Sequence, residues 1–367
     1  MSHAAAGLLA TIPVACMGLF ALPAAAASAR WGTRRAIAAC LAAIASAGLL
    51  RAAAPSALVV LLLTVPVGIG MGACGALLPV AVKERFAARA AVATGAYTTG
   101  IQVGAVTSTL VVVALAGAGS WRLSLAVLSL SAVAVTVAWL ALDHDGGAPP
   151  PTAPRRAELG AVVRTRAVWV LVAVFALMGM VYYGLVAWLP DAYGERGWSE
   201  RSAGGLIAAL SFAQIPGALG GAWLGRRIPD RRVLLGAAAC VLAAGAIGVA
   251  LVPSAAYVGA VLAGLGMGLL FTAVLTVPLD LGAGPTEAGA IAGVMLTGGY
   301  VAAACSPVIL GALRDATGSF TGVLDGVAGT AVTLVAVCLL LPRGTHNAAS
   351  NDPMRSSPAS RSSRAVP

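Results

Sequence analysis

Residues 67–104 read VGIGMGACGALLPVAVKERFAARAAVATGAYTTGIQVG, two apolar runs joined by a short basic loop. Glycines recur along both runs, at positions 68, 70 and 72 and again at 95, 100 and 104. Small residues at such spacing let two helices approach closely inside a bilayer. Polar side chains interrupt the second run, and polar groups in lipid must face protein or a water-filled cavity. The stretch therefore predicts two membrane helices that line a polar path.

The composition extends this interpretation to the whole chain. Of its 367 residues, 59% are hydrophobic and only 10% are charged, and the mean hydropathy is +0.93. A soluble domain carries about 25% charged residues, so this chain needs lipid as its solvent. The net charge of +10 does not indicate nucleic acid, because the arginines lie in short loops and form no continuous stripe. The cysteines include no CxxC pair and the histidines lie at or beyond the ends of the apolar runs, so we expect no disulfide, metal site or cofactor.

Eleven apolar runs are long enough to cross a hydrocarbon core, which takes about 20 residues. They form a bundle of five in residues 1–142 and a bundle of six in residues 167–341. A proline-rich linker, 143–166, separates the bundles, and a Ser- and Arg-rich tail, 342–367, is expected to be disordered. The predicted spans are 4–27, 36–53, 57–82, 91–115, 121–142, 167–189, 203–225, 233–251, 255–279, 288–313 and 322–341.

The basic residues are distributed unevenly between the two sets of loops. Eighteen of the 23 Lys and Arg residues lie at one set of span ends, and five lie at the alternate set. By the positive-inside rule the first set, which includes the C-terminus, is cytoplasmic and the N-terminus is outside. We therefore expect a monomeric integral protein of a bacterial-type inner (plasma) membrane, with the lipid bilayer as its main partner.

The two bundles repeat each other at an offset of 196 to 199 residues. GIGMG at 68–72 matches GLGMG at 264–268, the Arg pair at 34–35 matches the pair at 231–232, and Thr-Gly at 99–100 matches Thr-Gly at 297–298. The run 167–189 has no partner in the first bundle. We therefore hypothesise that the intact protein has twelve spans and that its first helix precedes Met1.

Parallel six-helix repeats describe the major facilitator superfamily, and the chain up to residue 341 resembles it. RWGTRR at 30–35 is similar to the superfamily's basic loop motif, with alanine at position 29 where an acid is expected. LPVAVKERF at 78–86, TGAYTTG at 94–100, and YY at 182–183 followed by AWLP at 187–190 resemble the cyanate and nitroimidazole transporter family. The resemblance implies an all-α membrane fold of two pseudo-symmetric bundles. It also implies secondary transport of a small solute, such as cyanate or a nitroimidazole, by alternating access.

The resemblance further implies which side chains border a solute cavity between the halves, near the membrane midplane. These polar residues have a structural alternative, because an interhelical hydrogen bond or simple packing would also satisfy them. Trp188 lies near the end of its run, where we expect it to anchor in the interface. The candidate cavity residues are Tyr97, Thr98, Gln102, Tyr182, Tyr183, Gln214, Thr297 and Tyr300.

A second candidate set lies in the basic loops, where charges determine topology by meeting anionic lipid. A role as gate latches is the alternative hypothesis for the same residues. They are Arg30, Arg34, Arg35, Lys83, Arg85, Asp230, Arg231 and Arg232.

Other function classes are less compatible with the sequence. No carboxylate lies near the middle of a predicted span, so a proton is a candidate co-substrate without a visible Asp or Glu carrier. A facilitator or efflux carrier for another small organic solute therefore stays open. A membrane-embedded enzyme would need a nucleophile, base or metal cluster, and GxSxG, HExxH and Walker motifs are absent. A sensor would need a soluble signalling domain, so we predict a transporter and no catalytic residues.

Overall fold

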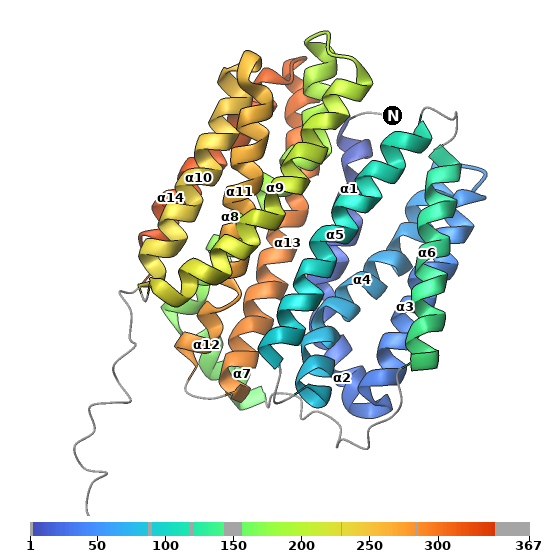
Figure 1. Ribbon diagram of the computed structural model, residues 1–367, viewed down its shortest axis with the longest axis vertical. Helices are drawn as coiled ribbons and strands as arrows, with labels where there is room; N and C mark the ends of the chain where they lie inside the picture. The colour runs from blue at the N-terminus through green and yellow to red at the C-terminus, as the bar shows by residue number, and fades with distance from the viewer. Residues whose placement is uncertain are drawn as a thin grey trace, which may run out of the picture.

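The computed structural model describes residues 3–86, 90–116, 121–142, 156–228, 230–282 and 285–341, and over these ranges the chain is helical (Figure 1). Helices are the expected outcome for an apolar chain, because in lipid each helix satisfies its own backbone polar groups. The helices are α1 (His3–Leu19), α2 (Ala21–Trp31), α3 (Thr33–Ala52), α4 (Ala57–Arg85), α5 (Ala90–Ala116), α6 (Trp121–Leu142), α7 (Arg156–Val163), α8 (Arg166–Glu195), α9 (Glu200–Arg227), α10 (Arg231–Leu251), the 3₁₀ turn η2 (Pro253–Ala255), α11 (Ala256–Val274), α12 (Val277–Leu281), α13 (Pro285–Thr317) and α14 (Thr321–Cys338).

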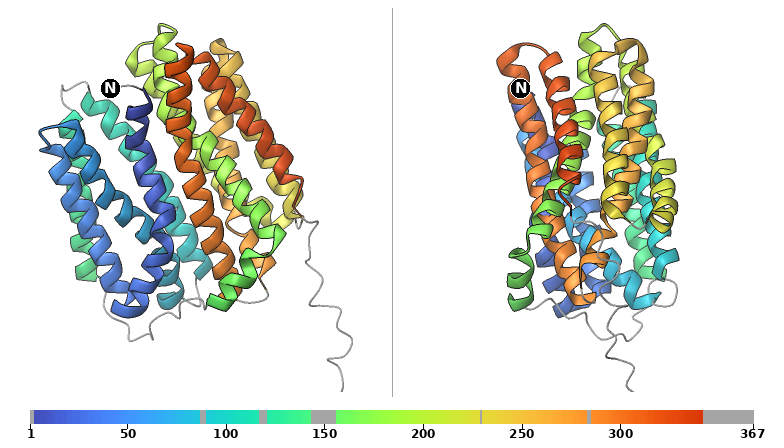
Figure 2. Two further views of the ribbon diagram at one scale, coloured as in Figure 1. Left: turned by 180° about the vertical axis from the view of Figure 1, so that it is seen from behind. Right: turned by 90° about the vertical axis from the view of Figure 1, so that its left-hand side faces the viewer.

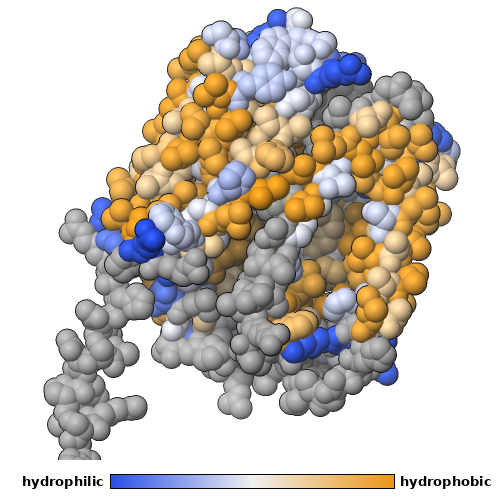
Figure 3. All heavy atoms as spheres, in the orientation of Figure 1, coloured by the Kyte–Doolittle hydropathy of each residue, from blue (hydrophilic) through white to orange (hydrophobic). Residues whose placement is uncertain are grey.

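Every predicted span coincides with one helix or with a pair of helices. Nine helices in the described ranges are long and apolar enough to cross a membrane, and two shorter apolar segments, Gly7–Leu19 and Val103–Val112, lie on α1 and α5. Apolar side chains cover the middle of the molecule, and polar ones gather towards its two ends (Figure 3). The prediction of an all-α membrane protein is confirmed.

Two predicted spans are divided, each next to a proline. The first breaks at Phe20, with φ −101° and ψ 1°, because Pro23 has no amide to bond the Leu19 carbonyl. The span 255–279 divides into α11 and α12, since Pro278 leaves the Val274 carbonyl without an amide partner. The linker contains α7, which its composition did not predict. The triple proline of the linker and the tail lie outside the described residues.

The repeat seen in the sequence is also a repeat of helix contacts. Helix α4 packs on α1 and α3, and its counterpart α11 packs on α9 and α10. The matched glycine motifs make these contacts. A Cβ on Gly68 would lie 2.9 Å from Cys16 of α1, and a Cβ on Gly264 would collide with the Leu210 carbonyl of α9. The glycines are needed because the helix backbones touch there.

Helix α8 has no counterpart among the described residues of the first half. It packs between α13 and α14, visible from behind as the green helix in Figure 2. Gly299 of α13 lies against the Phe175 ring of α8 at this contact. In the first half, α5 and α6 have no described helix between them, and Figure 3 shows a recess on the α6 side of α5. The expectation of a twelfth helix stays a prediction.

The two halves meet along two seams, α1 with α13 and α5 with α9. In the first seam Thr11 Oγ1 donates a hydrogen bond to the Ala304 carbonyl at 2.7 Å. A Cβ on Gly7 would lie 2.8 Å from the Pro307 oxygen, and a Cβ on Gly18 would lie 2.8 Å from the Thr297 oxygen. We call the end of the molecule that carries Arg34, Arg85 and Arg231 the basic end; it is the lower end in Figure 1. The contacts of the α1–α13 seam lie on α1, which is farther from the basic end than the α1–α2 break.

Candidate functional site

Helices α8 and α13 bring three predicted tyrosines together. The Tyr182 and Tyr183 rings lie 5.2 Å apart at an interplanar angle of 69°. Tyr300 contacts Phe175 edge to face, with ring centroids 5.0 Å apart. Tyr183 and Tyr300 also pack against a small buried cluster formed by Val14 of α1, in the first half, with Ala303 and Ala304 of α13. The tyrosines are held in place by packing from both halves.

Two further predicted residues join this group from α9 and α5. Gln214 is 5% exposed and shares a side-chain hydrogen bond with Tyr182. Tyr97 of α5 lies close enough to Tyr300 of α13 for their hydroxyl groups to interact electrostatically. We call Tyr97, Tyr182, Tyr183, Tyr300 and Gln214 the tyrosine cluster. It is assembled by four helices from the two halves of the molecule.

Protein does not cover the whole surface of the cluster. Tyr183 and Tyr300 lie deep within the molecule, yet both keep part of their surface accessible, as does Tyr97. Thr297 lies one turn before Tyr300 on α13, and its buried hydroxyl has no hydrogen-bond partner among the described residues. Accessible tyrosines and an unpartnered hydroxyl at this depth suit a polar solute or water better than lipid.

The remaining two cavity candidates, Thr98 and Gln102, belong to α5, whose helical backbone is described, but their side chains lie outside the described set. The side chains that make up the tyrosine cluster are uncharged. Within the part of the chain that the structure describes, no three His, Cys, Asp or Glu residues are grouped as metal ligands. The cluster can therefore offer hydroxyl and amide hydrogen bonds and aromatic faces.

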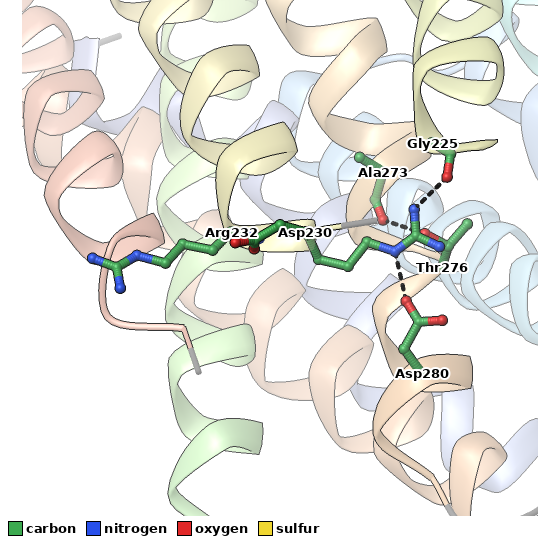
Figure 4. Close-up of polar contacts among 7 residues, drawn as sticks. Gly225, Asp230, Arg232, Ala273, Thr276 and Asp280 are labelled. Carbon is green, nitrogen blue, oxygen red and sulfur yellow. Dashed lines mark hydrogen bonds and ion pairs between the residues drawn. The ribbon is translucent and has the colours of Figure 1, made fainter. Parts of the chain in front are cut away.

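The basic loop of the second half forms a set of contacts around Arg231 (Figure 4). Arg231 Nε donates to Asp280 Oδ2 at 2.6 Å, and Nη1 donates to the Gly225 carbonyl at 2.9 Å. Asp230 Oδ1 accepts the Arg232 backbone amide at 2.9 Å and so caps α10. The Arg232 side chain extends away from Asp280. Arg231 thus ties the start of α10 to α9 and α12 within one half.

The matching loop of the first half is braced in a similar way. Arg34 Nη2 donates to the Leu140 carbonyl at 2.9 Å, and Trp139 Nε1 donates to the Arg34 carbonyl at 3.2 Å. The Arg85 guanidinium lies 5.5 Å from the centroid of the Trp139 ring. Arg30 and Arg35 are exposed, and the Lys83 side chain lies outside the described set.

Several well-ordered contacts at the opposite end were not predicted. Trp188 is buried and donates Nε1–H to the Pro307 carbonyl at 2.9 Å, so the expectation of an interfacial anchor was wrong. The Tyr193 hydroxyl donates to the Val249 carbonyl at 2.7 Å, and Arg196 Nη2 donates to the Ala250 carbonyl at 3.2 Å. Position near the end of an apolar run does not distinguish a buried Trp from an interfacial one; partners more than fifty residues away decide the difference.

Known proteins resemble this chain along most of its length. The sequence profile of the Major Facilitator Superfamily matches residues 1–307. The 2-nitroimidazole transporter of Escherichia coli (strain K12) is 29% identical over 330 residues, which cover 89% of this chain and 84% of the relative. The cyanate transport protein CynX of the same organism is 31% identical over 329 residues, covering 87% and 83%.

Solved structures share the fold at lower sequence identity. A D-xylose–proton symporter superposes with a TM-score of 0.72 at 15% identity, covering 93% of this chain and 89% of the symporter. A bacterial homologue of the human lysosomal transporter Spinster, in an inward-facing and occupied conformation, gives a TM-score of 0.66 at 20% identity, covering 93% and 87%. These likenesses support the two-bundle fold.

Proposed function

This chain belongs to the major facilitator superfamily and is a secondary transporter of small solutes, and we propose that it binds its solute at the tyrosine cluster. The observation that carries the proposal is that Tyr97 from the first half lies within electrostatic range of Tyr300 from the second half, as does Tyr182. When the two halves rock against each other, they can control the passage of a solute that contacts both of them.

The chemistry of the cluster favours a small planar solute that is aromatic or weakly charged. Tyrosine faces stack on planar groups, and the Tyr182–Gln214 pair and the Thr297 hydroxyl offer hydrogen bonds. A dianion would find no cationic side chain in the cluster and would pay a large desolvation cost. 2-Nitroimidazole, the solute in the name of one relative, is planar and aromatic. Cyanate, in the name of the other, is a small linear monoanion, with half the charge of a dianion.

The driving force is a separate part of the proposal. The described acidic residues lie near helix ends, as Asp280 and Asp325 do, and none belongs to the tyrosine cluster. Facilitated transport or efflux is therefore an alternative to proton symport. Proton symport is the activity named for the D-xylose symporter, which shares the fold. We place the basic end and the C-terminus in the cytoplasm of a bacterial inner membrane, following the positive-inside rule, and expect a monomer.

Uptake into proteoliposomes tests the proposal. Radiolabelled cyanate and 2-nitroimidazole are offered separately, with and without an imposed pH gradient, to the wild type and to Tyr300→Phe. We expect saturable uptake of at least one solute and a raised KM in Tyr300→Phe, because that variant loses only a hydroxyl. Absence of uptake of both solutes contradicts the substrate proposal, and uptake that does not respond to the gradient contradicts proton coupling.

A further inference from the structure

We propose that the seam between α5 and α9 holds the acyl chain of a bilayer lipid in an apolar pocket built by both halves. The pocket has a volume of about 520 Å³ and lies between α5, α9 and α11. The side chains that line it include Val106, Leu110, Ala209, Phe212, Pro216 and Leu265.

Helical geometry directs this pocket away from the tyrosine cluster. Val106 follows Tyr97 by nine residues, or two and a half turns of α5, so the two side chains leave opposite faces of the helix. Phe212 and Gln214 are two residues apart on α9 and therefore point about 200° apart. Gln214 faces Tyr182 of α8. The pocket consequently opens on the outer surface of the bundle.

The outer surface at this depth is bathed by hydrocarbon. The pocket residues 209–216 lie near the middle of α9, which runs from Glu200 to Arg227. Phe212 is 64% exposed and Leu110 is 55% exposed, and lipid tails are the medium at the middle of a span. The lining is apolar throughout, so a solute that needs hydrogen bonds would lose them on entry. The volume falls in the range of ligand pockets, about 300 to 1,000 Å³.

The two seams between the halves are packed differently, and the apolar pocket lies in the α5–α9 seam. Glycine backbones and the Thr11–Ala304 hydrogen bond close the α1–α13 seam. In the α5–α9 seam, side chains such as Val106, Leu110 and Leu265 border the open pocket instead. A chain in the α5–α9 pocket touches both halves, so it stabilises this arrangement of the halves over others. This consequence rests on the proposed transport cycle, whereas binding of the chain does not.

Photolabelling of the full-length protein tests the site. The protein is reconstituted in vesicles of phosphatidylcholine that include a phosphatidylcholine with a diazirine in the middle of one acyl chain, then irradiated and mapped by mass spectrometry. Leu130 of α6 is the matched control, because it is 57% exposed on an open helix face. We expect labelling at Leu110 to exceed that at Leu130 by about five- to tenfold, since a bound chain resides longer than bulk lipid.

Filling the pocket provides the second arm. Ala209→Phe should lower labelling at Leu110 to the level of Leu130 and leave Leu130 unchanged. If that variant fails to purify as a monodisperse protein, Ala208→Leu fills the same pocket from the next position. Equal labelling of the two leucines, or labelling at Leu110 that survives the filling variant, overturns the proposal. Cross-linking of two copies through Leu110 would also overturn it. None of these outcomes depends on whether cyanate is transported.

Discussion

The α1–α13 seam makes a quantitative prediction about Gly18. In Gly18→Ala the new Cβ would lie 2.8 Å from the Thr297 oxygen and 2.9 Å from Val301 Cγ2. Carbon atoms normally approach to about 3.5 to 4.0 Å, so α1 and α13 must separate. Overpacking of this kind costs about 1 to 3 kcal/mol. The seam between the halves should therefore weaken.

A matched variant isolates this contact from the general effect of alanine. Replacing glycine by alanine within a helix stabilises it by about 0.5 to 1 kcal/mol, and this gain applies equally to Gly100→Ala on α5. A Cβ at Gly100 meets no atom within 4 Å. The difference between the two variants is then the overpacking cost alone.

Thermal unfolding in detergent supplemented with lipid measures that difference. At roughly 2 °C per kcal/mol for a protein of this size, Gly18→Ala should unfold about 2 to 6 °C below Gly100→Ala. Both variants should express and insert at wild-type levels, since each adds only one methyl group to an apolar helix. A Gly18→Ala variant as stable as Gly100→Ala would refute the close approach of α1 and α13.

Three further substitutions test individual contacts. Tyr193→Phe removes the buried hydrogen bond to the Val249 carbonyl and should lower the free energy of unfolding by about 1 to 3 kcal/mol. The control is Tyr257→Phe, because the Tyr257 hydroxyl donates to the Ser202 carbonyl from an exposed position; its loss should be smaller in the same unfolding assay. Asp280→Asn removes the charge paired with Arg231. Because the Asp280 and Arg231 side chains are 30% and 21% exposed, the free energy of unfolding should fall by about 1 kcal/mol or less. This loss should become smaller as salt is added to the unfolding buffer. Tyr182→Phe loses its hydrogen bond to Gln214 and should raise the KM for the solute by about three- to tenfold at unchanged surface expression, whereas an unchanged KM would remove Tyr182 from the site.

Hydropathy predicted the helices because length and apolarity are local properties of the chain. Each span from 4–27 to 322–341 coincides with helical structure, and the glycine motifs that defined the repeat make matching contacts in both halves. The break at Phe20 was missed although Pro23 marks it, because proline is tolerated within many membrane helices.

Side-chain partners were much harder to predict than helices. The Arg231–Asp280 pair joins residues 49 positions apart, and its existence depends on where α12 turns after Pro278. Trp188 was expected at the membrane interface because the sequence shows only its position near the end of an apolar run. Its burial depends on its contact with α13. Tyr97 and Tyr300 were both chosen as polar interruptions of apolar runs, and this signal works because lipid cannot satisfy such groups.

Access of water to Tyr300 tests the central proposal most directly. Tyr300→Cys, in a background with the native cysteines replaced, is exposed to a membrane-impermeant thiol reagent in sealed vesicles, with and without solute. We predict labelling by this reagent, because Tyr300 keeps part of its surface accessible, and protection by the transported solute. Labelling only by a lipid-soluble reagent, without protection by solute, would contradict a solute path between the two halves.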